Sequence, residues 1–257
     1  GDTRSIKLAN LFAEEGNEVN IYGFKNAGFE LGIKESQSLS EAIDASDIVI
    51  GPLPCSNDDE TINAPFHDEK IYLKEIFKIM SKNQLFIAGR ISHKIAHMAE
   101  IYNVYCIDFF EREEMTVLNA IPTAEGAIQI AMEEMPITLH DSNALVLGFG
   151  RIGKMLSKML KGIGAQVFVE ARKYSDIAWI KGYGYIPVNL NELGNYLSKM
   201  DVIFNTVPHI ILDNEMLSKI RKDTIIIDLA SKPGGVDFEK AKIAGLKAIW
   251  ALSLPGK

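Results

Sequence analysis

The chain has 257 residues, of which 47% are hydrophobic and 24% charged, and its formal net charge is −7. This length is enough for two ordinary domains or one large α/β unit, and the apolar content excludes a disordered chain. The acidic balance argues against nucleic acid or an anionic membrane as the main partner. No apolar run reaches the roughly 18–20 residues that a membrane span needs. The only cysteines are Cys55 and Cys106, so we expect a reducing, cytoplasmic environment without a disulfide framework.

Short β-branched or apolar runs alternate with longer amphipathic stretches, which is typical of an α/β protein with parallel sheets. In the first half, strands are predicted over residues 18–22, 47–50, 84–87 and 104–108. Helices are predicted over residues 4–15, 40–45, 73–81 and 92–101. The sequence starts at a strand-to-helix turn and stops after Leu-Pro-Gly. We therefore expect a flavodoxin-like or Rossmann-like first lobe, with trimming at both termini of the chain.

The second half is more regular and predicts a doubly wound Rossmann domain with six parallel strands. The predicted strands cover residues 144–148, 166–171, 185–188, 201–206, 224–228 and 247–251. The predicted helices cover residues 150–163, 174–182, 190–200, 214–220 and 237–244. Another helix is predicted over residues 123–134, because Pro122 suits the position before a first turn that holds Thr123. The expected parts are a substrate-side lobe (1–122), a linking helix (123–139) and an NAD(P)-binding domain (140–257).

A glycine fingerprint, Gly-Phe-Gly-Arg-Ile-Gly, follows a predicted apolar strand and opens a predicted helix, as dinucleotide binding requires. In this context Gly148 permits a tight turn, Gly150 lets the backbone approach a pyrophosphate, and Gly153 allows close packing of helix and strand. Arg151 and Ile152 lie in the first helical turn, whose free N–H groups attract phosphate. The motif therefore predicts a nicotinamide dinucleotide cofactor.

The end of the second Rossmann strand decides between NAD and NADP. Alignment on the fingerprint places Ala171 where an acidic residue normally binds the ribose, and the cations Arg172 and Lys173 follow. A one-residue shift would instead make Glu170 that acid, and the two side chains point to opposite faces of the strand. A cation can pair with a 2′-phosphate. We therefore favour NADP, with NAD as the alternative.

Two further loops follow predicted strands at the carboxyl edge of the sheet, where a doubly wound domain binds its cofactor. The residues expected to contribute are Thr206, Val207, Pro208, Asp228 and Ala230. Asp228 is equally consistent with a turn cap and a catalytic role. His209 borders the first of these loops and is a candidate acid–base group.

A polar cluster lies at the predicted junction of the two parts: Arg112, Glu113, Asn119, Thr123 and Glu125. These side chains are either solvated or face the crevice in which substrate meets the cofactor, and we favour the second interpretation. An arginine suits bidentate binding of a carboxylate, and a helix start suits a second anion. No metal site is predicted, because His93 and His97 lack a third ligand.

Several motifs together resemble the family of dipicolinate synthase A subunits, from one end of the chain to the other. The motifs are Gly1-Asp-Thr-Arg4, Glu111-Arg-Glu113, Asn119-Ala-Ile-Pro-Thr-Ala-Glu-Gly126, the glycine fingerprint, Asn205-Thr-Val-Pro208, Asp228-Leu-Ala-Ser-Lys-Pro-Gly-Gly235 and Leu254-Pro-Gly256. The resemblance implies a lobe and a Rossmann domain like those of D-2-hydroxyacid dehydrogenases, and a flavoprotein-like partner, the B subunit of dipicolinate synthase. It also implies oxidation of a dihydrodipicolinate, a lysine-pathway intermediate, to dipicolinate in the mother cell of a sporulating bacterium.

The implied product is a planar dianion, which calls for two anion clamps. Arg112 with the helix start at Thr123 is one expected clamp, and Arg4 or Arg90 is the other. The candidates for a base are His209, Glu113 and Asp228, and positioning beside the nicotinamide contributes more than acid–base help.

Two other functions remain open. One is a hydroxyacid or shikimate-type dehydrogenase, although no histidine follows Gly235 as the hydroxyacid class requires. The other is a non-catalytic nucleotide-binding component of a complex. We also expect a homo-oligomer.

Overall fold

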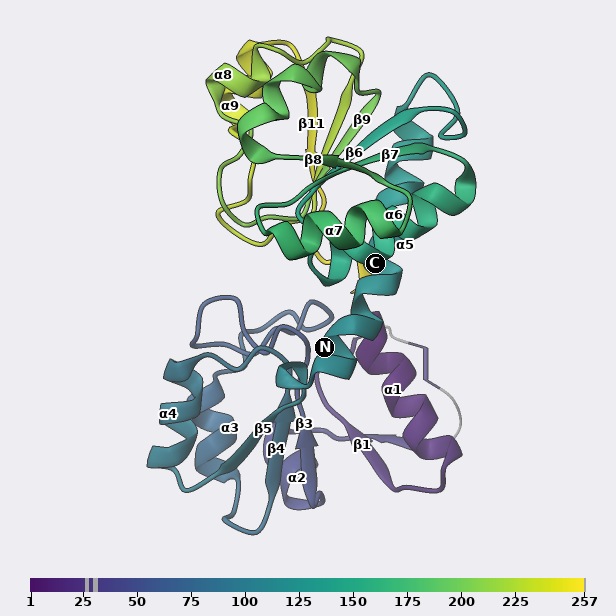
Figure 1. Ribbon diagram of the computed structural model, residues 1–257. Helices are drawn as coiled ribbons and strands as arrows, with labels where there is room; N and C mark the ends of the chain where they lie inside the picture. Colours follow the sequence, from purple (N-terminus) through teal and green to yellow (C-terminus); the bar gives the residue numbers. More distant parts are fainter. Residues whose placement is uncertain (26–27, 30–31, 257) are drawn as a thin grey trace. The chain divides into compact units, whose positions relative to one another are not determined.

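The computed structural model describes residues 1–25, 28–29 and 32–256. The chain divides into two compact units, essentially Gly1–Thr116 and Val117–Pro255, which we call unit 1 and unit 2 (Figure 1). The boundary falls inside a helix, a few residues before the predicted end of the first lobe at residue 122. Within the described residues, no helix is both long enough and apolar enough to cross a membrane.

Unit 1 contains two small parallel sheets. The strands are β1 (Val19–Ile21) paired with β2 (Ile33–Glu35), and β3 (Ile48–Ile50), β4 (Leu85–Ala88) and β5 (Tyr105–Asp108) in that order. The helices are α1 (Thr3–Glu14), α2 (Leu39–Asp44), α3 (Leu73–Ile79) and α4 (His93–Ile101), followed by the 3-10 turn η1 (Phe109–Glu111). All eight predicted elements of this half are present. Strand β2 was not predicted, because its sequence, Ile-Lys-Glu, holds a single apolar side chain and two charged ones, which give no strand pattern.

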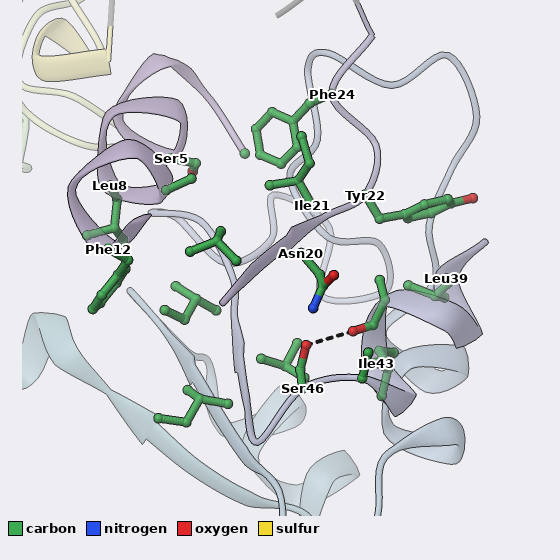
Figure 2. A pocket seen from close by; sticks show the side chains of 18 of the residues that line it. Ser5, Leu8, Phe12, Asn20, Ile21, Tyr22, Phe24, Leu39, Ile43 and Ser46 are labelled. Carbon is green, nitrogen blue, oxygen red and sulfur yellow. Dashed lines mark hydrogen bonds between the residues drawn. The ribbon is translucent and has the colours of Figure 1, made fainter. Parts of the chain in front are cut away.

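Apolar side chains of α3, α4 and β4 form the core of unit 1, with Phe77 and Phe86 in edge-to-face contact at 5.1 Å between ring centroids. A cavity of about 640 Å³ lies beside this core. Figure 2 shows that it is bordered by α1 through Ser5, Leu8 and Phe12, and by β1 through Asn20 and Ile21.

Unit 2 is built on one six-stranded parallel sheet. Its strands are β6 (Asn143–Leu147), β7 (Gln166–Glu170), β8 (Ile186–Val188), β9 (Val202–Asn205), β10 (Ile225–Asp228) and β11 (Lys247–Trp250). They lie in the order β11-β10-β9-β6-β7-β8. The chain therefore adds β7 and β8 on one side of β6 and then β9, β10 and β11 on its other side, with all strands parallel. This order confirms the predicted doubly wound Rossmann architecture. Two apolar clusters cover the two faces of the sheet.

The helices of unit 2 are α6 (Arg151–Ile163), α7 (Tyr174–Gly182), α8 (Asn214–Leu217) and α9 (Phe238–Ile243), and the 3-10 turn η4 (Leu254–Gly256) follows β11. One predicted helix, over residues 190–200, is wrong. Two 3-10 segments, η2 (Leu190–Asn195) and η3 (Leu197–Lys199), stand in its place. Gly194 and Asn195 are poor helix formers, and short i→i+3 bonds such as Tyr196 N to Leu193 O suffice for this connection.

The predicted linking helix begins ten residues earlier than expected, as α5 (Glu113–Glu134), and crosses the boundary between the units. Pro122 therefore lies inside the helix rather than before it. Two acidic residues, Glu113 and Glu114, occupy its first turn, where the helix dipole favours negative charge. The prediction gave Pro122 too much weight, since a proline can stand within a helix at the cost of one hydrogen bond and a local kink.

Candidate functional site

The glycine fingerprint of unit 2 has the geometry that its sequence predicts. Gly148 has a φ of +92°, and a Cβ atom there would lie 2.7 Å from Thr206 Oγ1. A Cβ atom on Gly153 would lie 2.2 Å from the Gly148 carbonyl oxygen. These two positions admit no side chain, because the Thr206 hydroxyl and the Gly148 carbonyl group occupy the space.

Gly150 differs from the other two glycines because its surroundings are open. It is the N-cap residue of α6, and beyond its two chain neighbours no described atom lies within 4 Å of the place its Cβ would take. The first turn of α6 has no side-chain cap, and it opens on Arg151, whose side chain is exposed, and Ile152, which packs against the core. Open space in front of uncapped N–H groups is the arrangement that binds a pyrophosphate. The residues present therefore fit a dinucleotide cofactor.

The side chains at the end of β7, where the ribose of a cofactor would bind, differ in their exposure to solvent. Glu170 is only 2% exposed, and its Oε1 atom has no hydrogen-bond partner among the described residues. Burial raises the pKa of this carboxyl, although the backbone N–H of Gly148 and the charge of Arg172 oppose the shift. Ala171 is also buried, whereas Arg172 and Lys173 are exposed. The cations, and not the carboxyl, are therefore accessible to a ligand.

Replacing Glu170 by glutamine is expected to raise the Tm at pH 8 by about 2–4 °C and to leave it unchanged near pH 4. A carboxyl whose pKa is higher in the folded state holds its proton more tightly there, so it costs stability as the pH rises above the ordinary carboxyl range. Thermal unfolding of both proteins between pH 4 and 8 measures the effect. The exposed Glu192→Gln exchange is the control and should change nothing; an equally flat profile for Glu170→Gln would contradict the prediction.

The loops after β9 and β10 are held together by a buried pair, Asn205 and Asp228, which face each other in the sheet register and are both 0% exposed. The Asp228 carboxylate accepts hydrogen bonds from Asn205 Nδ2 at 2.7 Å, from the Ala230 N–H at 3.0 Å and from the Gly235 N–H at 2.8 Å. Asn205 also binds both backbone groups of Val207, since Nδ2 donates to its carbonyl at 3.0 Å and Oδ1 accepts from its N–H at 3.2 Å.

This network favours the turn-cap interpretation of Asp228 over a catalytic role. The hydrogen bonds that the Asp228 carboxylate accepts all come from groups of this protein, and the carboxylate is closed to solvent. Asn205 and Gly235 belong to motifs of the sequence but were not among the predicted site residues. Gly235 is required here, because a Cβ atom would lie 2.2 Å from Asn205 Nδ2. The sequence does contain a feature that could have identified this pair: Asn205 and Asp228 are the polar last residues of two consecutive apolar strands.

The other predicted residues of this edge have distinct surroundings. Thr206 Oγ1 donates to the Leu147 carbonyl at 2.8 Å, so this side chain braces the fingerprint turn. Pro208 and His209 are exposed, which leaves His209 accessible as a candidate acid–base group. Ala230 is buried, and its carbonyl accepts a bond of 2.9 Å from Trp250 Nε1.

The three arginines predicted as anion clamps differ in how far other groups of the protein already bind their side chains. Arg4 forms hydrogen bonds of 3.1 Å from Nε to both carboxylate oxygens of Asp2, and its Nη2 also donates to the Leu53 carbonyl. Arg112 pairs with Glu114 on the exposed surface. Arg90 is exposed, has a φ of +57°, and its side chain has no partner among the described residues. Of these three arginines, Arg90 is therefore the one most available to a ligand.

The predicted helix start at Thr123 is wrong, because this residue lies in the middle of α5, where no free helix N-terminus is available to an anion. Thr123 is 8% exposed, and its Oγ1 donates to the Asn119 carbonyl at 2.8 Å. Glu125 is exposed on the same helix. Glu113, another predicted site residue, is the first residue of this helix, and its backbone carbonyl accepts a hydrogen bond of 2.8 Å from the Thr116 hydroxyl.

Neither cysteine is placed for nucleophilic chemistry. Burial raises the pKa of the Cys55 thiol to about 12 and that of Cys106 to about 11, so both thiols are protonated at neutral pH. Among the described residues, no three His, Cys, Asp or Glu side chains come together as metal ligands.

Comparison with known families matches both units. Residues 1–110 match the family model for the N-terminal domain of the dipicolinate synthase A subunit. Residues 116–247 match "D-isomer specific 2-hydroxyacid dehydrogenase, NAD binding domain". An L-alanine dehydrogenase, 14% identical with a TM-score of 0.63 over 97% of this chain and 78% of that one, shares the fold.

Two relatives extend the match over the whole chain. The dipicolinate synthase A subunit of Bacillus subtilis (strain 168) is 31% identical over 260 residues, which cover 100% of this chain and 87% of the relative. The crystal structure of the dipicolinate synthase A subunit from Bacillus halodurans is 28% identical with a TM-score of 0.88, over 100% of this chain and 88% of that one. The chain therefore belongs to the family of dipicolinate synthase A subunits and carries a dehydrogenase-type NAD-binding domain.

Proposed function

We propose that this chain oxidises dihydrodipicolinate to dipicolinate with NADP, as the A subunit of a cytoplasmic enzyme of spore formation that also contains the B subunit. The observation that carries the proposal is the fingerprint turn of Gly148, Gly150 and Gly153, intact in a chain of this family. Aromatising the dihydropyridine ring removes one hydride and one proton, and an oxidised nicotinamide, when bound, accepts the hydride.

The exposed cations after β7 support NADP over NAD. Ala171 offers no carboxylate to the ribose hydroxyls, and the Glu170 carboxyl is closed to solvent. Arg172 and Lys173 are exposed at the same edge, where a 2′-phosphate would find a bidentate guanidinium partner.

Replacing Arg172 by alanine is expected to weaken NADP binding by about 10- to 100-fold and to change NAD binding by less than about 2-fold. Only NADP carries the 2′-phosphate that this guanidinium would pair with. Titration calorimetry with both nucleotides measures the change, and Lys181→Ala, an exposed cation on α7, is the matched control. Equal losses for NAD and NADP would contradict the assignment.

The substrate is a planar dicarboxylate, and unit 1 supplies cations for it. The guanidinium of Arg90 is available, whereas that of Arg112 must exchange an exposed partner, Glu114. Arg4 is already committed to Asp2. The proton leaves to a base, for which His209 and Glu113 are exposed candidates; the bonds of Asp228 make it a structural residue.

The experiment combines the purified chain, with and without its partner B subunit, with dihydrodipicolinate and NADP or NAD. Formation of NADPH and of ultraviolet-absorbing dipicolinate in equal amounts is the expected result. If neither NADP nor NAD gives product, the proposal is contradicted. NADP binding without turnover in the presence of the partner would instead identify a nucleotide-binding component of the complex.

A further inference from the structure

The loop that follows β10 is fixed on both sides of a short exposed turn. Before the turn, the Ala230 carbonyl accepts a hydrogen bond of 2.9 Å from Trp250 Nε1. After the turn, the Gly235 carbonyl accepts one of 3.0 Å from the Leu212 N–H. The Asp228 carboxylate joins the two sides, since it binds the N–H groups of both Ala230 and Gly235. The backbone on either side of the turn is therefore held in one place.

The turn itself consists of Ser231, Lys232, Pro233 and Gly234. The Gly234 N–H closes it by donating to the Ser231 carbonyl at 2.8 Å. Gly234 is buried with a φ of +83°, and a Cβ atom there would lie 2.9 Å from Asp228 Oδ2. The three residues before it are exposed. The fold thus presents a lysine to solvent on a braced turn, and this lysine has none of the roles assigned above.

Lys232 is the single cation in its part of the carboxyl edge. The loops after β9, β10 and β11 cover residues 206–213, 229–237 and 251–256, and within these described ranges it is the only lysine or arginine. Both acids that remain near the surface of these loops, Asp213 and Asp237, accept hydrogen bonds at the starts of α8 and α9. The ammonium of Lys232 has no ion-pair or hydrogen-bond partner among the described residues, so it is available to an anionic ligand.

The two halves of the sheet indicate which part of the cofactor lies beside this turn. A doubly wound domain binds one mononucleotide on each half. The fingerprint turn after β6 and the cations after β7 assign the adenosine part to the half made of β6, β7 and β8. The nicotinamide part then belongs to the half made of β9, β10 and β11, and Lys232 is the cation of that half.

We propose that Lys232 binds one carboxylate of the dicarboxylate substrate and so holds the dihydropyridine ring beside the nicotinamide; this inference rests on the proposed function. The three arginines considered above for the substrate all belong to unit 1. A cation on the same unit as the cofactor fixes one end of the dianion relative to the hydride acceptor, which is the positioning that the reaction needs. An ammonium has three donors on a flexible stem, which suits a carboxylate at an exposed turn.

The test uses the complex of this chain with its partner B subunit, saturated with NADP. Dipicolinate and NADP are both oxidised, so they bind without reacting, and titration calorimetry measures the affinity for dipicolinate. Lys232→Ala is expected to weaken this affinity by about 10- to 100-fold, and Lys232→Arg, which keeps the charge, by less than about 3-fold. Picolinate has one carboxylate and can place it at another cation, so its affinity should fall less than that of dipicolinate.

The control for the loss of a surface charge is Lys242→Ala, an exposed lysine of α9, which should change neither affinity. An unchanged Tm and NADP affinity in the Lys232 variants show that unit 2 remains folded. Unchanged dipicolinate affinity in Lys232→Ala would overturn the proposal. So would an equal loss of affinity for NADP and NAD, since the ammonium would then bind a cofactor phosphate. If the unaltered complex does not bind dipicolinate, the proposed function itself fails, and the role of Lys232 fails with it.

Discussion

Replacement of Asp228 by alanine is expected to lower the free energy of unfolding by about 4 kcal/mol, through the loss of one buried acceptor that serves three donors. The N–H groups of Ala230 and Gly235 would lose their partner in a place closed to water. Asn205 would keep only its bonds to Val207. The loop that follows β10 at the cofactor edge would therefore lose its anchor, and NADP affinity should fall with stability.

Denaturant unfolding monitored by circular dichroism measures this loss. The control is Asp237→Ala, which removes another aspartate cap in unit 2 and should cost about 1 kcal/mol. Among the described residues, the Asp237 carboxylate accepts a single hydrogen bond, from the Lys240 N–H at 3.0 Å. The double variant with Asn205→Ala should lose less than the sum of the single variants, because the two side chains belong to one network. A cost for Asp228→Ala no larger than that of the control would contradict the prediction.

The sheet of unit 2 could be predicted almost completely from the sequence. Its central strands are buried on both faces and appear as uninterrupted apolar runs, such as Ile225–Asp228, between clear turn signals. The fingerprint then locates the cofactor edge, because its glycines are needed for backbone reasons that do not depend on the rest of the fold. What this pattern could not supply was the pairing of Asn205 with Asp228, since partners across strands are a property of the sheet register.

Burial decided two questions that spacing left open. Period-two alternation placed Glu170 and Ala171 on opposite faces, but it did not show which face is accessible. The structure buries the carboxyl of Glu170 beneath the fingerprint turn and leaves Arg172 exposed. In α5, a local rule about proline gave the wrong start, because the helix is stabilised by the buried side chains on both sides of Pro122. The anion site predicted at Thr123 depended on that start and loses its helix N-terminus.

Alanine at each of three glycines of the α6 region is expected to give three different results. Gly153→Ala places a methyl group 2.2 Å from the Gly148 carbonyl, so it should cost about 2 kcal/mol and reduce NADP affinity by at least about 100-fold. Gly150→Ala meets no atom beyond its chain neighbours, so stability should fall by at most about 1 kcal/mol, because alanine is a poorer N-cap than glycine, while NADP affinity falls by a factor similar to that for Gly153→Ala. Gly162→Ala, in open space on the same helix, should raise stability by about 0.5–1 kcal/mol and leave affinity unchanged.

The contrast between Gly150 and Gly153 separates cofactor binding from folding. If the fingerprint were only a tight connection between β6 and α6, both Gly150→Ala and Gly162→Ala would keep full NADP affinity, because neither added methyl group touches the protein. Loss of affinity at position 150 alone, at a temperature where the variant is fully folded, requires that a ligand approach the backbone at the start of α6. Calorimetric titration with NADP and thermal unfolding of the same three samples therefore test the cofactor site independently of any substrate or partner protein.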